Sequence, residues 1–207
     1  MSQPADARPG LRERKKAKTR AAIQAHALRL FSIQGYQATT VEQIAEAAEV
    51  SPSTFFRYFP TKEEVVMHDR YDPLLLAAFH AQPRELTPVQ ALRRALAEVL
   101  GRLPADDLKL EQTRGRLIFT VPELRGRFMD QIADTIQILT EAIAERMGRD
   151  PSEFAVRNFA GALVGISLAA VNDLTGDPEA DYLAAFDRGL EHLEAGLPLD
   201  PEPPARQ

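Results

Sequence analysis

Small hydroxyl groups, cations and aromatic rings are interleaved over residues 39–62 of this chain. Ser51, Ser53 and Thr54 carry side chains short enough to approach the edges of base pairs, where a hydroxyl can donate or accept a hydrogen bond. The groups that suit contacts with phosphate are two adjacent hydroxyls, a phenol and two cations: Thr39, Thr40, Tyr58, Arg57 and Lys62. This mixture predicts a surface that touches both the bases and the backbone of a nucleic acid.

Two short helices are needed to position these side chains, and the sequence contains a start signal for each. Thr40-Val-Glu-Gln43 is a capping box, which begins one helix and leaves its first N–H groups free for a phosphate. Ser51-Pro52 begins the next helix, with serine as N-cap and proline in the first turn. Phe55 and Phe59 lie four residues apart and would anchor the inner face of this second helix. We therefore expect a helix-turn-helix at about residues 40–62, with its second helix in the major groove of DNA.

The rest of the chain also has helical periodicity. Apolar residues line one face of a first helix near residues 13–34, and Gly35 would end it. Later starts are indicated at Thr61, at Thr87-Pro88, at Pro122 and at Asp150-Pro151, and a final helix is expected near 178–195. The fold class is therefore all-α, with about nine helices.

The composition divides this helical chain into four regions. Residues 1–10 are expected to be a disordered arm, and residues 197–207, which are rich in proline, a disordered tail. Between them we expect a three-helix DNA-binding domain over 11–62 and a larger C-terminal helical domain for ligand binding and dimerisation over 63–196. The fourth helix would link the two domains.

Charge is distributed unevenly along the chain, although the net charge is −5. Residues 1–62 hold ten Lys and Arg against five Asp and Glu, whereas the remainder is acidic. This asymmetry suggests a basic, DNA-facing end on an acidic body. The basic run Arg12–Arg20 would either contact the DNA backbone or be a solvated helix face.

Several classes of function are disfavoured by the sequence. Cysteine is absent, which excludes disulfides and thiolate chemistry and suits a cytoplasmic location. The four histidines are scattered, no catalytic or phosphate-loop motif is present, and we expect no catalytic residue, cofactor or metal. The most apolar run, Phe159–Val171, has 13 residues, fewer than the roughly 17–25 that span a bilayer, so no membrane partner is expected. A DNA-architectural protein without sequence specificity is the alternative, but it would need more positive charge than the acidic body supplies.

The order of these elements resembles one known family. The stretches RAAIQAHALRLFSIQGYQATT and TTVEQIAEAAEVSPSTFFRYFPTKEEVV are similar to the DNA-binding domain of the TetR family of regulators, over about residues 12–70. The resemblance implies that Ser51–Tyr58 is the recognition helix, that Ser53 and Thr54 touch bases or nearby phosphates, and that three residues clamp the backbone: Thr40, Tyr58 and Lys62. Members often have tyrosine where this chain has Phe56, so a phosphate hydrogen bond is lost there. Phe56 would instead touch a thymine methyl group or pack in the core, and Arg57 could compensate.

The resemblance also implies a homodimer, acting as a repressor, and a small-molecule effector that releases it from a palindromic operator. Small residues on one helix and apolar residues on the last helix would form a four-helix bundle with a second subunit, unless they pack only within one subunit: Gly161, Gly165, Ala169, Tyr182, Phe186 and Leu190. The candidate walls of the effector pocket are Phe79, Leu117, Phe119, Met129 and Phe159, and the polar candidates are Arg114, Arg116 and Asn158. The apolar majority favours a hydrophobic or amphipathic effector. Each of these residues is otherwise an ordinary core or surface residue.

Overall fold

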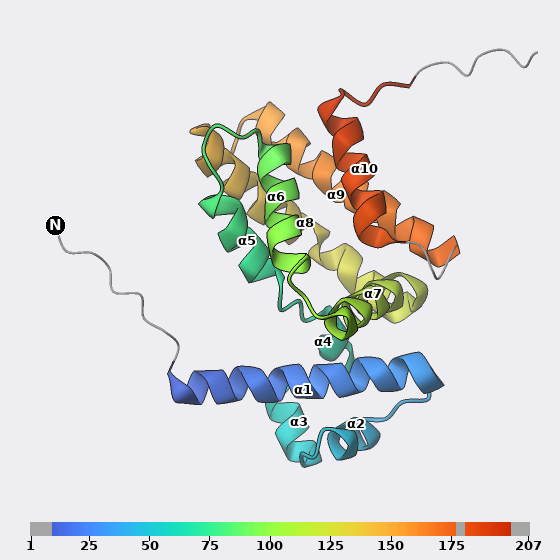
Figure 1. Cartoon of the computed structure of the whole chain (residues 1–207). Coiled ribbons are helices and arrows are strands. Elements are labelled where there is room, and N and C mark those ends of the chain that lie inside the picture. The colour runs from blue at the N-terminus through green and yellow to red at the C-terminus, as the bar shows by residue number, and fades with distance from the viewer. Residues whose placement is uncertain (1–9, 177–180, 200–207) are drawn as a thin grey trace, which may run out of the picture. The chain divides into compact units, whose positions relative to one another are not determined.

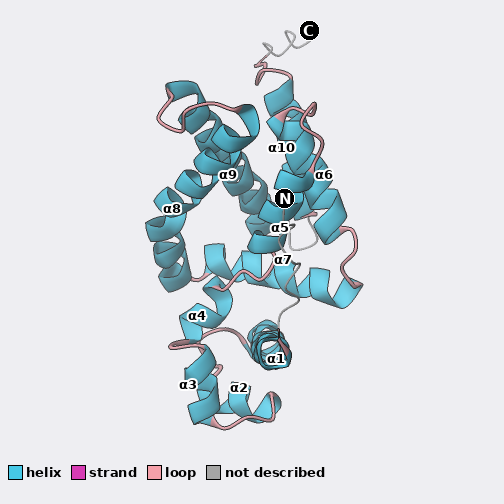
Figure 2. Ribbon diagram, turned by 90° about the vertical axis from the view of Figure 1, so that its left-hand side faces the viewer, coloured by secondary structure: helices cyan, strands magenta, loops and turns pink. Residues whose placement is uncertain are grey.

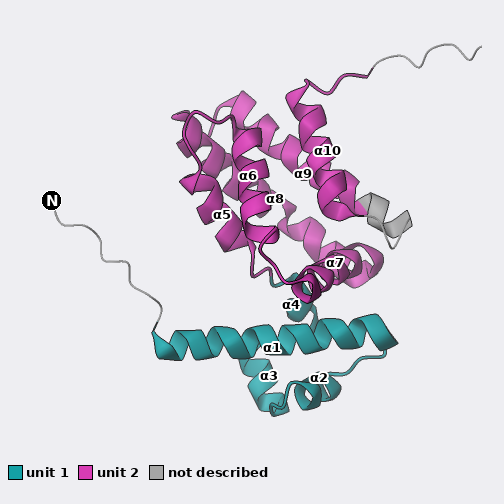
Figure 3. Ribbon diagram, viewed as in Figure 1, with its two compact units in different colours: residues 1–68 teal, residues 69–207 magenta. Residues whose placement is uncertain are grey.

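The computed structural model describes residues 10–176 and 181–199, and every regular element in these ranges is a helix (Figures 1 and 2). The all-α prediction is therefore confirmed, with ten helices in these ranges where the sequence indicated about nine. Most of the expected disordered arm and tail lies outside the described residues. The chain divides into two compact units, residues 1–68 and 69–207 (Figure 3).

Unit 1 contains four helices, α1 (Leu11–Gln34), α2 (Val41–Ala47), α3 (Pro52–Tyr58) and α4 (Lys62–Met67). The local start signals place three of them within a residue of their observed beginnings, because Thr40, Ser51 and Thr61 all accept a hydrogen bond as N-caps. Helix α1 ends at Gly35, whose φ of +86° is one that residues with a side chain rarely adopt. The core of unit 1 is formed by apolar residues of all four helices, including Ile23, Leu28, Phe31, Ile44, Phe55, Phe59, Val65 and Val66.

Unit 2 contains six helices, α5 (Asp72–Ala81), α6 (Pro88–Leu100), α7 (Ala105–Thr120), α8 (Pro122–Met147), α9 (Phe154–Gly176) and α10 (Tyr182–Glu194). Helix α8 begins at the predicted proline and ends at Gly148, which takes a left-handed φ of +63°. Helix α9 packs against α7, α8 and α10, and α5 against α6. The core between them includes Phe79, Leu92, Ile143, Ala160, Leu163, Phe186 and Leu190.

One predicted helix start is wrong. Asp150-Pro151 does not begin α9, which starts at Phe154. The Asp150 carboxylate accepts from the Ser152 N–H at 2.7 Å, and the Asp150 N–H donates to Glu153 Oε1 at 3.0 Å. These bonds close a turn before the helix, so the Asp-Pro pair marks a turn here and not an N-cap.

A buried arginine holds the connection between α5 and α6. Arg146 of α8 is only 6% exposed, and its guanidinium donates to the carbonyls of four residues: Phe79, Gln82, Pro83 and Leu86. These carbonyls lie at the end of α5 and in the following turn, where a helix leaves its acceptors unsatisfied. Burial lowers the pKa of Arg146, with the nearby Arg84 acting in the same direction. No periodic pattern in the sequence pointed to this residue.

Candidate nucleic-acid interface

The start of α3 carries a connected group of hydroxyls. Ser51 Oγ accepts from the Thr54 N–H at 3.1 Å, lies 2.9 Å from Ser53 Oγ and donates to Thr54 Oγ1 at 2.9 Å. Ser51 and Ser53 are exposed, and Thr54 is half-buried. The group therefore caps the helix and at the same time presents hydroxyls to solvent, which is the geometry that contacts with base edges require.

Two aromatic side chains fix this helix to unit 1. Phe55 and Phe59 are fully buried, with ring centroids 6.1 Å apart. Phe56 lies between them in sequence but is 50% exposed, and its ring meets the Phe55 ring edge-on at 5.4 Å. Of the two alternatives for Phe56, the structure places it on the surface of α3.

The other end of α3 combines an exposed cation with an internal support. Arg57 is exposed, its Nη2 donates to Thr54 Oγ1 at 3.4 Å, and its guanidinium lies 5.7 Å from the Tyr58 ring centroid. The Tyr58 carbonyl accepts from Arg20 Nη2 at 3.0 Å, and the same guanidinium lies 5.1 Å from the Phe59 ring centroid. Arg20, which was expected only as part of a basic run, is thus a structural residue that ties α1 to α3.

Helix α2 begins with the predicted capping box. Thr40 is exposed, its Oγ1 accepts from the Gln43 N–H at 3.2 Å, and its N–H donates to Gln43 Oε1 at 2.9 Å. Gln34 Nε2 also donates to Gln43 Oε1 at 2.9 Å, which links the start of α2 to the end of α1. The Thr40 side chain therefore lies on the surface at the beginning of α2, where the helix dipole favours an anion.

Two residues predicted to contact phosphate make hydrogen bonds within unit 1. Thr39 is 1% exposed, and its hydroxyl donates to the Gly35 carbonyl at 2.8 Å, so it cannot reach DNA. Lys62 is half-buried, and its Nζ donates to the carbonyls of Tyr36 and Thr39 at 2.9 and 3.1 Å. The ammonium also lies 4.2 Å from the Tyr36 ring centroid. Both side chains hold the turn between α1 and α2, which leads directly into Thr40.

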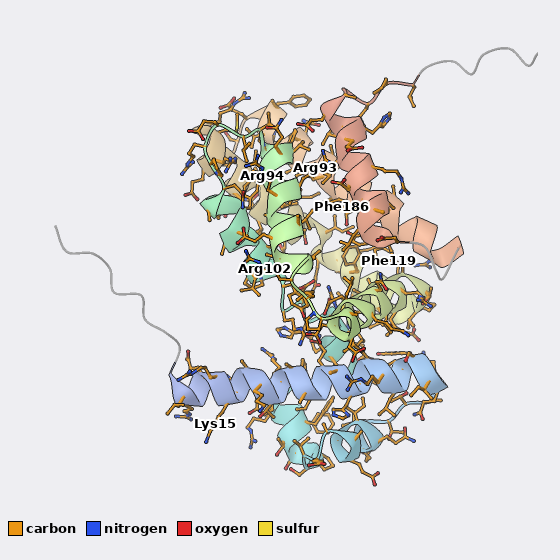
Figure 4. The ribbon with its side chains drawn as sticks, in the orientation of Figure 1. Lys15, Arg93, Arg94, Arg102, Phe119 and Phe186 are labelled. Carbon is orange, nitrogen blue, oxygen red and sulfur yellow. The ribbon has the colours of Figure 1, made fainter. Side chains whose placement is uncertain are left out.

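The basic run occupies the free end of α1. Residues 11–18 are all exposed, and Lys15 lies in this part of the helix (Figure 4). Within the described ranges, no ion pair involves the five cations of these turns, Arg12, Arg14, Lys15, Lys16 and Lys18. The free end of α1 is therefore a second basic surface of unit 1, with no role in packing this unit.

The eight candidates for an effector pocket do not line the hollow between α6 and α10 described below, and only Asn158 lines the hollow beside Gly161. Phe79 is core, Phe119 of α7 (labelled in Figure 4) has its ring edge-on to Phe128 of α8 at 5.0 Å by the ring centroids, and Met129 is 47% exposed. Asn158 of α9 is exposed. The remaining four candidates are half-buried residues of α7 and α9: Arg114, Arg116, Leu117 and Phe159. Arg114 is held by two carboxylates, because its Nη2 binds Asp69 and its Nε binds Glu111 at 2.7 Å. It is not a free cation for an anionic ligand.

A hollow of about 700 Å³ instead lies between α6 and α10. Its apolar lining includes Leu96, Leu100 and Leu183, and its polar lining includes Gln90 and Arg94. Volumes of this size are typical of sites for small molecules. None of the eight candidates lines it.

Arg93 of α6 (labelled in Figure 4) is one of the residues that line this hollow, and it joins α6 to α10. Its guanidinium binds both oxygens of Asp187 at 2.5 and 2.8 Å and one oxygen of Glu191 at 2.7 Å. The hydrogen bonds to Asp187 raise the pKa of Arg93, and the same bonds lower the pKa of the Asp187 carboxyl. Two parallel bonds of this kind also fix geometry, so α6 and α10 are held in one relative position.

The residues expected at a dimer interface separate into two sets. Phe186 and Leu190 are 7% and 0% exposed in the core of unit 2, and Tyr182 stacks on Phe186 and bonds to Ser167 at 2.9 Å. The last helix thus packs Phe186 and Leu190 into the core of its own unit, and Tyr182 lies half-buried against that core. Gly165 and Ala169 are exposed and Gly161 is half-exposed, so the face of α9 remains available.

The glycines of α9 are not explained by packing within the subunit. A Cβ added at Gly161 or Gly165 would have no atom within 4 Å, whereas one added at Gly189 of α10 would lie 2.4 Å from Ile166 Cγ2. The close approach of α9 and α10 therefore depends on Gly189. Beside Gly161, a second hollow of about 580 Å³ is lined by Ile136, Phe154, Arg157, Asn158 and Ala162.

Helix α9 is also apolar enough, by length and composition, to cross a membrane over residues 154–171. Only a third of this window is buried inside the unit. The core helix of a soluble protein passes the same test, and α9 has one side in the core and, on another, the exposed Gly165 and Ala169. Among the described residues, no group of three or more His, Asp or Glu could hold a metal ion.

Comparison with known proteins agrees with this geometry. Residues 23–67 match the model for bacterial regulatory proteins of the tetR family, and residues 86–198 match the model for the MftR C-terminal domain. The HTH-type transcriptional regulator TcmR of Streptomyces glaucescens is 36% identical over 203 residues, covering 93% of this chain and 90% of that protein. The HTH-type transcriptional regulator RutR of Escherichia coli is 30% identical over 150 residues, covering 68% and 66%.

Solved structures share the fold. The complex of SmeT with triclosan superposes with a TM-score of 0.61 at 20% identity, covering 86% of this chain and 91% of that one. FadR of Thermus thermophilus, a repressor solved with lauroyl-CoA, superposes with a TM-score of 0.50 at 26% identity, covering 91% and 99%. The helical architecture described above is therefore one that known regulators use.

Proposed function

This chain belongs to the TetR family of bacterial regulatory proteins, and we propose that it is a repressor that binds a palindromic operator as a homodimer. A small hydrophobic or amphipathic effector releases it. The protein acts in the cytoplasm and has no enzymatic activity.

The observation that carries the proposal is the outer surface of α3. The hydroxyls of Ser51 and Ser53 and the cation of Arg57 are exposed on a helix whose inner side is fixed by Phe55 and Phe59. To read the major groove, a helix needs large side chains that fix its inner face to the protein and short polar side chains on its outer face that can approach the bases. Arg57, with its planar set of donors, is the residue best suited to recognise a guanine.

Footprinting on the DNA that flanks this protein's own gene tests the proposal. One protected palindrome is expected, and uniform coverage would indicate an architectural protein instead. The variant Ser53→Ala/Arg57→Ala should lose the footprint. The matched control Arg29→Ala/Ser32→Ala, which removes two exposed side chains from α1, should keep it.

The dimer is supported by the exposed small residues of α9. Gly161, Gly165 and Ala169 follow one another at helical spacing on one side, and small residues allow two helices to approach closely. This face lies beside the hollow that Phe154 borders, and Phe154 itself is 75% exposed. A second copy of the chain would bury this apolar surface. Sedimentation that showed a stable monomer at micromolar concentration would refute the dimer.

The effector proposal is supported by the hollow between α6 and α10. Leucine side chains line it, and Arg94 and Gln90 add polar groups at its wall, so it suits an apolar molecule with a polar end. The related structures hold triclosan and lauroyl-CoA, which are molecules of this kind. Thermal-shift measurements with chlorinated phenols, acyl thioesters and aromatic acids test the class. No stabilisation by any of them, or the same stabilisation in Leu96→Trp, which fills the hollow, would reject this site.

Release requires only that the effector bind one arrangement of the dimer more tightly than the other. The two recognition helices of a dimer must be roughly 34–36 Å apart to enter successive major grooves. An effector that favours another spacing lowers the affinity for the operator without touching the DNA-binding residues.

A further inference from the structure

The hollow between α6 and α10 has a lining whose charges do not cancel. Its ionic lining residues are Arg93 and Arg94 of α6, both labelled in Figure 4, and Asp187 of α10. Arg93 binds both oxygens of Asp187, at 2.5 and 2.8 Å, so these two charges compensate each other. The positive charge of Arg94 is therefore the uncompensated charge of the lining.

Arg93 has little capacity left for a ligand. Besides its two bonds to Asp187, its Nη2 donates to Glu191 Oε1 at 2.7 Å, and its Nη1 lies 3.9 Å from Glu194 Oε2. Paired bonds between a guanidinium and a carboxylate are among the strong hydrogen bonds of proteins, so a ligand would not replace them at low cost. Arg93 therefore fixes the width of the hollow, and a charged ligand must find its partner elsewhere.

Arg94 has no partner of its own in the part of the chain that the structure describes. Its side chain is exposed, and no ion pair or side-chain hydrogen bond among these residues includes it. The carboxylate one helical turn later, Glu98, is at the i,i+4 spacing that would allow a pair. Glu98 is held by other residues, however, because Oε1 lies 3.3 Å from Arg102 Nη1 and Oε2 accepts from Gln82 Nε2 at 3.3 Å. The guanidinium of Arg94 is thus available to an anion.

The remaining lining is mainly apolar. The apolar side chains come from both helices and from the turn before α6: Leu86, Leu96, Ala97, Leu100 and Leu183. Leu96 and Leu100 are half-buried, and they follow Arg94 along α6. Six residues of helix separate Arg94 from Leu100, which is about 9 Å along the helix axis. The hollow therefore places a cation beside an apolar wall that an extended tail can follow.

We propose that the effector of this hollow is an organic anion with an apolar tail, and that Arg94 binds its acidic group. The inference rests on the proposed function, since it names the head group of the effector proposed for the same hollow. A guanidinium matches a carboxylate with two parallel hydrogen bonds, and the leucines remove the tail from water. A lipophilic cation would instead be repelled by Arg94 and would find Asp187 already bound to Arg93.

Isothermal titration calorimetry of the full-length protein with amphiphiles of one tail length tests the head group. Decanoate, decanol and decyltrimethylammonium, each kept below the concentration at which it forms micelles, share their tail and differ in charge. Decanoate should bind at least about tenfold more tightly than decanol, because hydrogen bonds to charged groups are stronger than those between neutral groups. The cation should bind more weakly than decanol. Equal affinities for decanoate and decanol, or tighter binding of the cation, would overturn the proposal.

Substitutions locate the charge that is responsible. Arg94→Gln should lower the affinity for decanoate to that for decanol and leave decanol unchanged, whereas Arg94→Lys should keep part of the difference. The matched control Arg188→Gln removes a cation of α10 that is also exposed but does not line the hollow, and it should change neither affinity. Equal loss in Arg94→Gln and Arg188→Gln would mean that surface charge in general attracts the anion, and the proposal would be wrong. Leu96→Trp, which fills the hollow, should weaken both decanoate and decanol, and unchanged binding of decanoate would place the anion outside the hollow.

Release from the operator separates this inference from the proposed function. Decanoate should displace the wild-type protein from the footprinted palindrome at a concentration at least about tenfold lower than decanol, and Arg94→Gln should abolish this difference. A protein that binds decanoate through Arg94 but stays on the operator would refute the effector role of the hollow and leave Arg94 as an anion site. A protein that protects no palindrome would refute the proposed function, and the calorimetric comparison would still decide the head group.

Discussion

A substitution at Gly165 tests directly whether α9 forms the dimer interface. It should change the free energy of unfolding of the subunit and the free energy of dimer dissociation in opposite directions. A methyl group at Gly165 meets no atom within 4 Å in the subunit. Replacing a glycine inside a helix by alanine stabilises the helix by about 1 kcal/mol. Gly165→Ala should therefore make the isolated subunit slightly more stable.

The same methyl group should weaken the dimer. If a second α9 lies against this face, the added group overpacks the contact at a cost of about 1–3 kcal/mol per site. A two-fold axis repeats the change, so the total is roughly 2–6 kcal/mol, and 1.4 kcal/mol is about tenfold in the dissociation constant. The gain in helix propensity is present in both states and cancels. The dimer dissociation constant should rise at least about 30-fold.

Sedimentation velocity over a dilution series measures this constant, and thermal unfolding of each variant measures the subunit. Gly126→Ala is the matched control, because Gly126 lies in α8, is exposed and also has open space around its Cβ position. It should gain stability and leave dissociation unchanged. An unchanged dissociation constant in Gly165→Ala would mean that α9 does not meet its partner through this face.

Three further predictions concern charge and specificity. Burial, and then the neighbouring charge of Asp69, raise the pKa of Asp72 to about 6, so the stability from its protonated form is present at low pH and is lost as pH rises through 6. Because the Asp72 side chain remains exposed to solvent, which screens its interactions, the loss between pH 5 and 7.5 should be no more than roughly 0.5–1 kcal/mol, and denaturation of Asp72→Asn at both pH values should show a correspondingly smaller change. Replacing the five cations of residues 11–18 by glutamine should lower the slope of log affinity against log salt by about 0.9 for each phosphate that the variant no longer neutralises, and an unchanged slope would make this run a solvated face. Phe56→Tyr restores the hydroxyl common in the family and should change the preferred operator in a selection from random DNA, whereas an identical consensus would exclude a role for this position in specificity.

Much of unit 1 could be predicted because its signals are local. A capping box, a serine before proline, a glycine after an apolar face and two phenylalanines four residues apart each depend on interactions within one turn of helix. For the same reason the outward position of Ser53 and the burial of Phe55 follow from the helix itself.

The direction of the long polar side chains could not be predicted in this way. Lys62 donates to carbonyls 23 and 26 residues earlier in the chain, and Arg93 binds a carboxylate 94 residues later. The residue type determines which hydrogen-bond partners such a side chain can have, but the tertiary fold determines which of these partners lies within hydrogen-bonding distance. The residue type of Thr39 predicts a surface hydroxyl, yet the turn after α1 buries this side chain.

The apolar residues of α10 show a second property that the sequence alone does not predict, which is the partner of an apolar face. The spacing of Tyr182, Phe186 and Leu190 predicts an apolar face, but a period of 3.6 residues does not identify what covers that face. The core of the same subunit covers it here. The open face of α9, where side chains are nearly absent, is the surface that we assign to the second subunit.

The burial of Arg146 has a consequence for the order of folding during synthesis. The carbonyls at the end of α5 and in the turn after it receive their donor from a residue 60 to 67 positions later. Unit 1 closes its side-chain contact from Gln24 to His68 over 44 residues. Since domains fold as the ribosome releases them, unit 1 can complete its contacts early, whereas the α5–α6 turn must wait until α8 has emerged. A nascent chain halted near residue 120 should therefore hold a protease-resistant DNA-binding unit ahead of a body that is still open to cleavage.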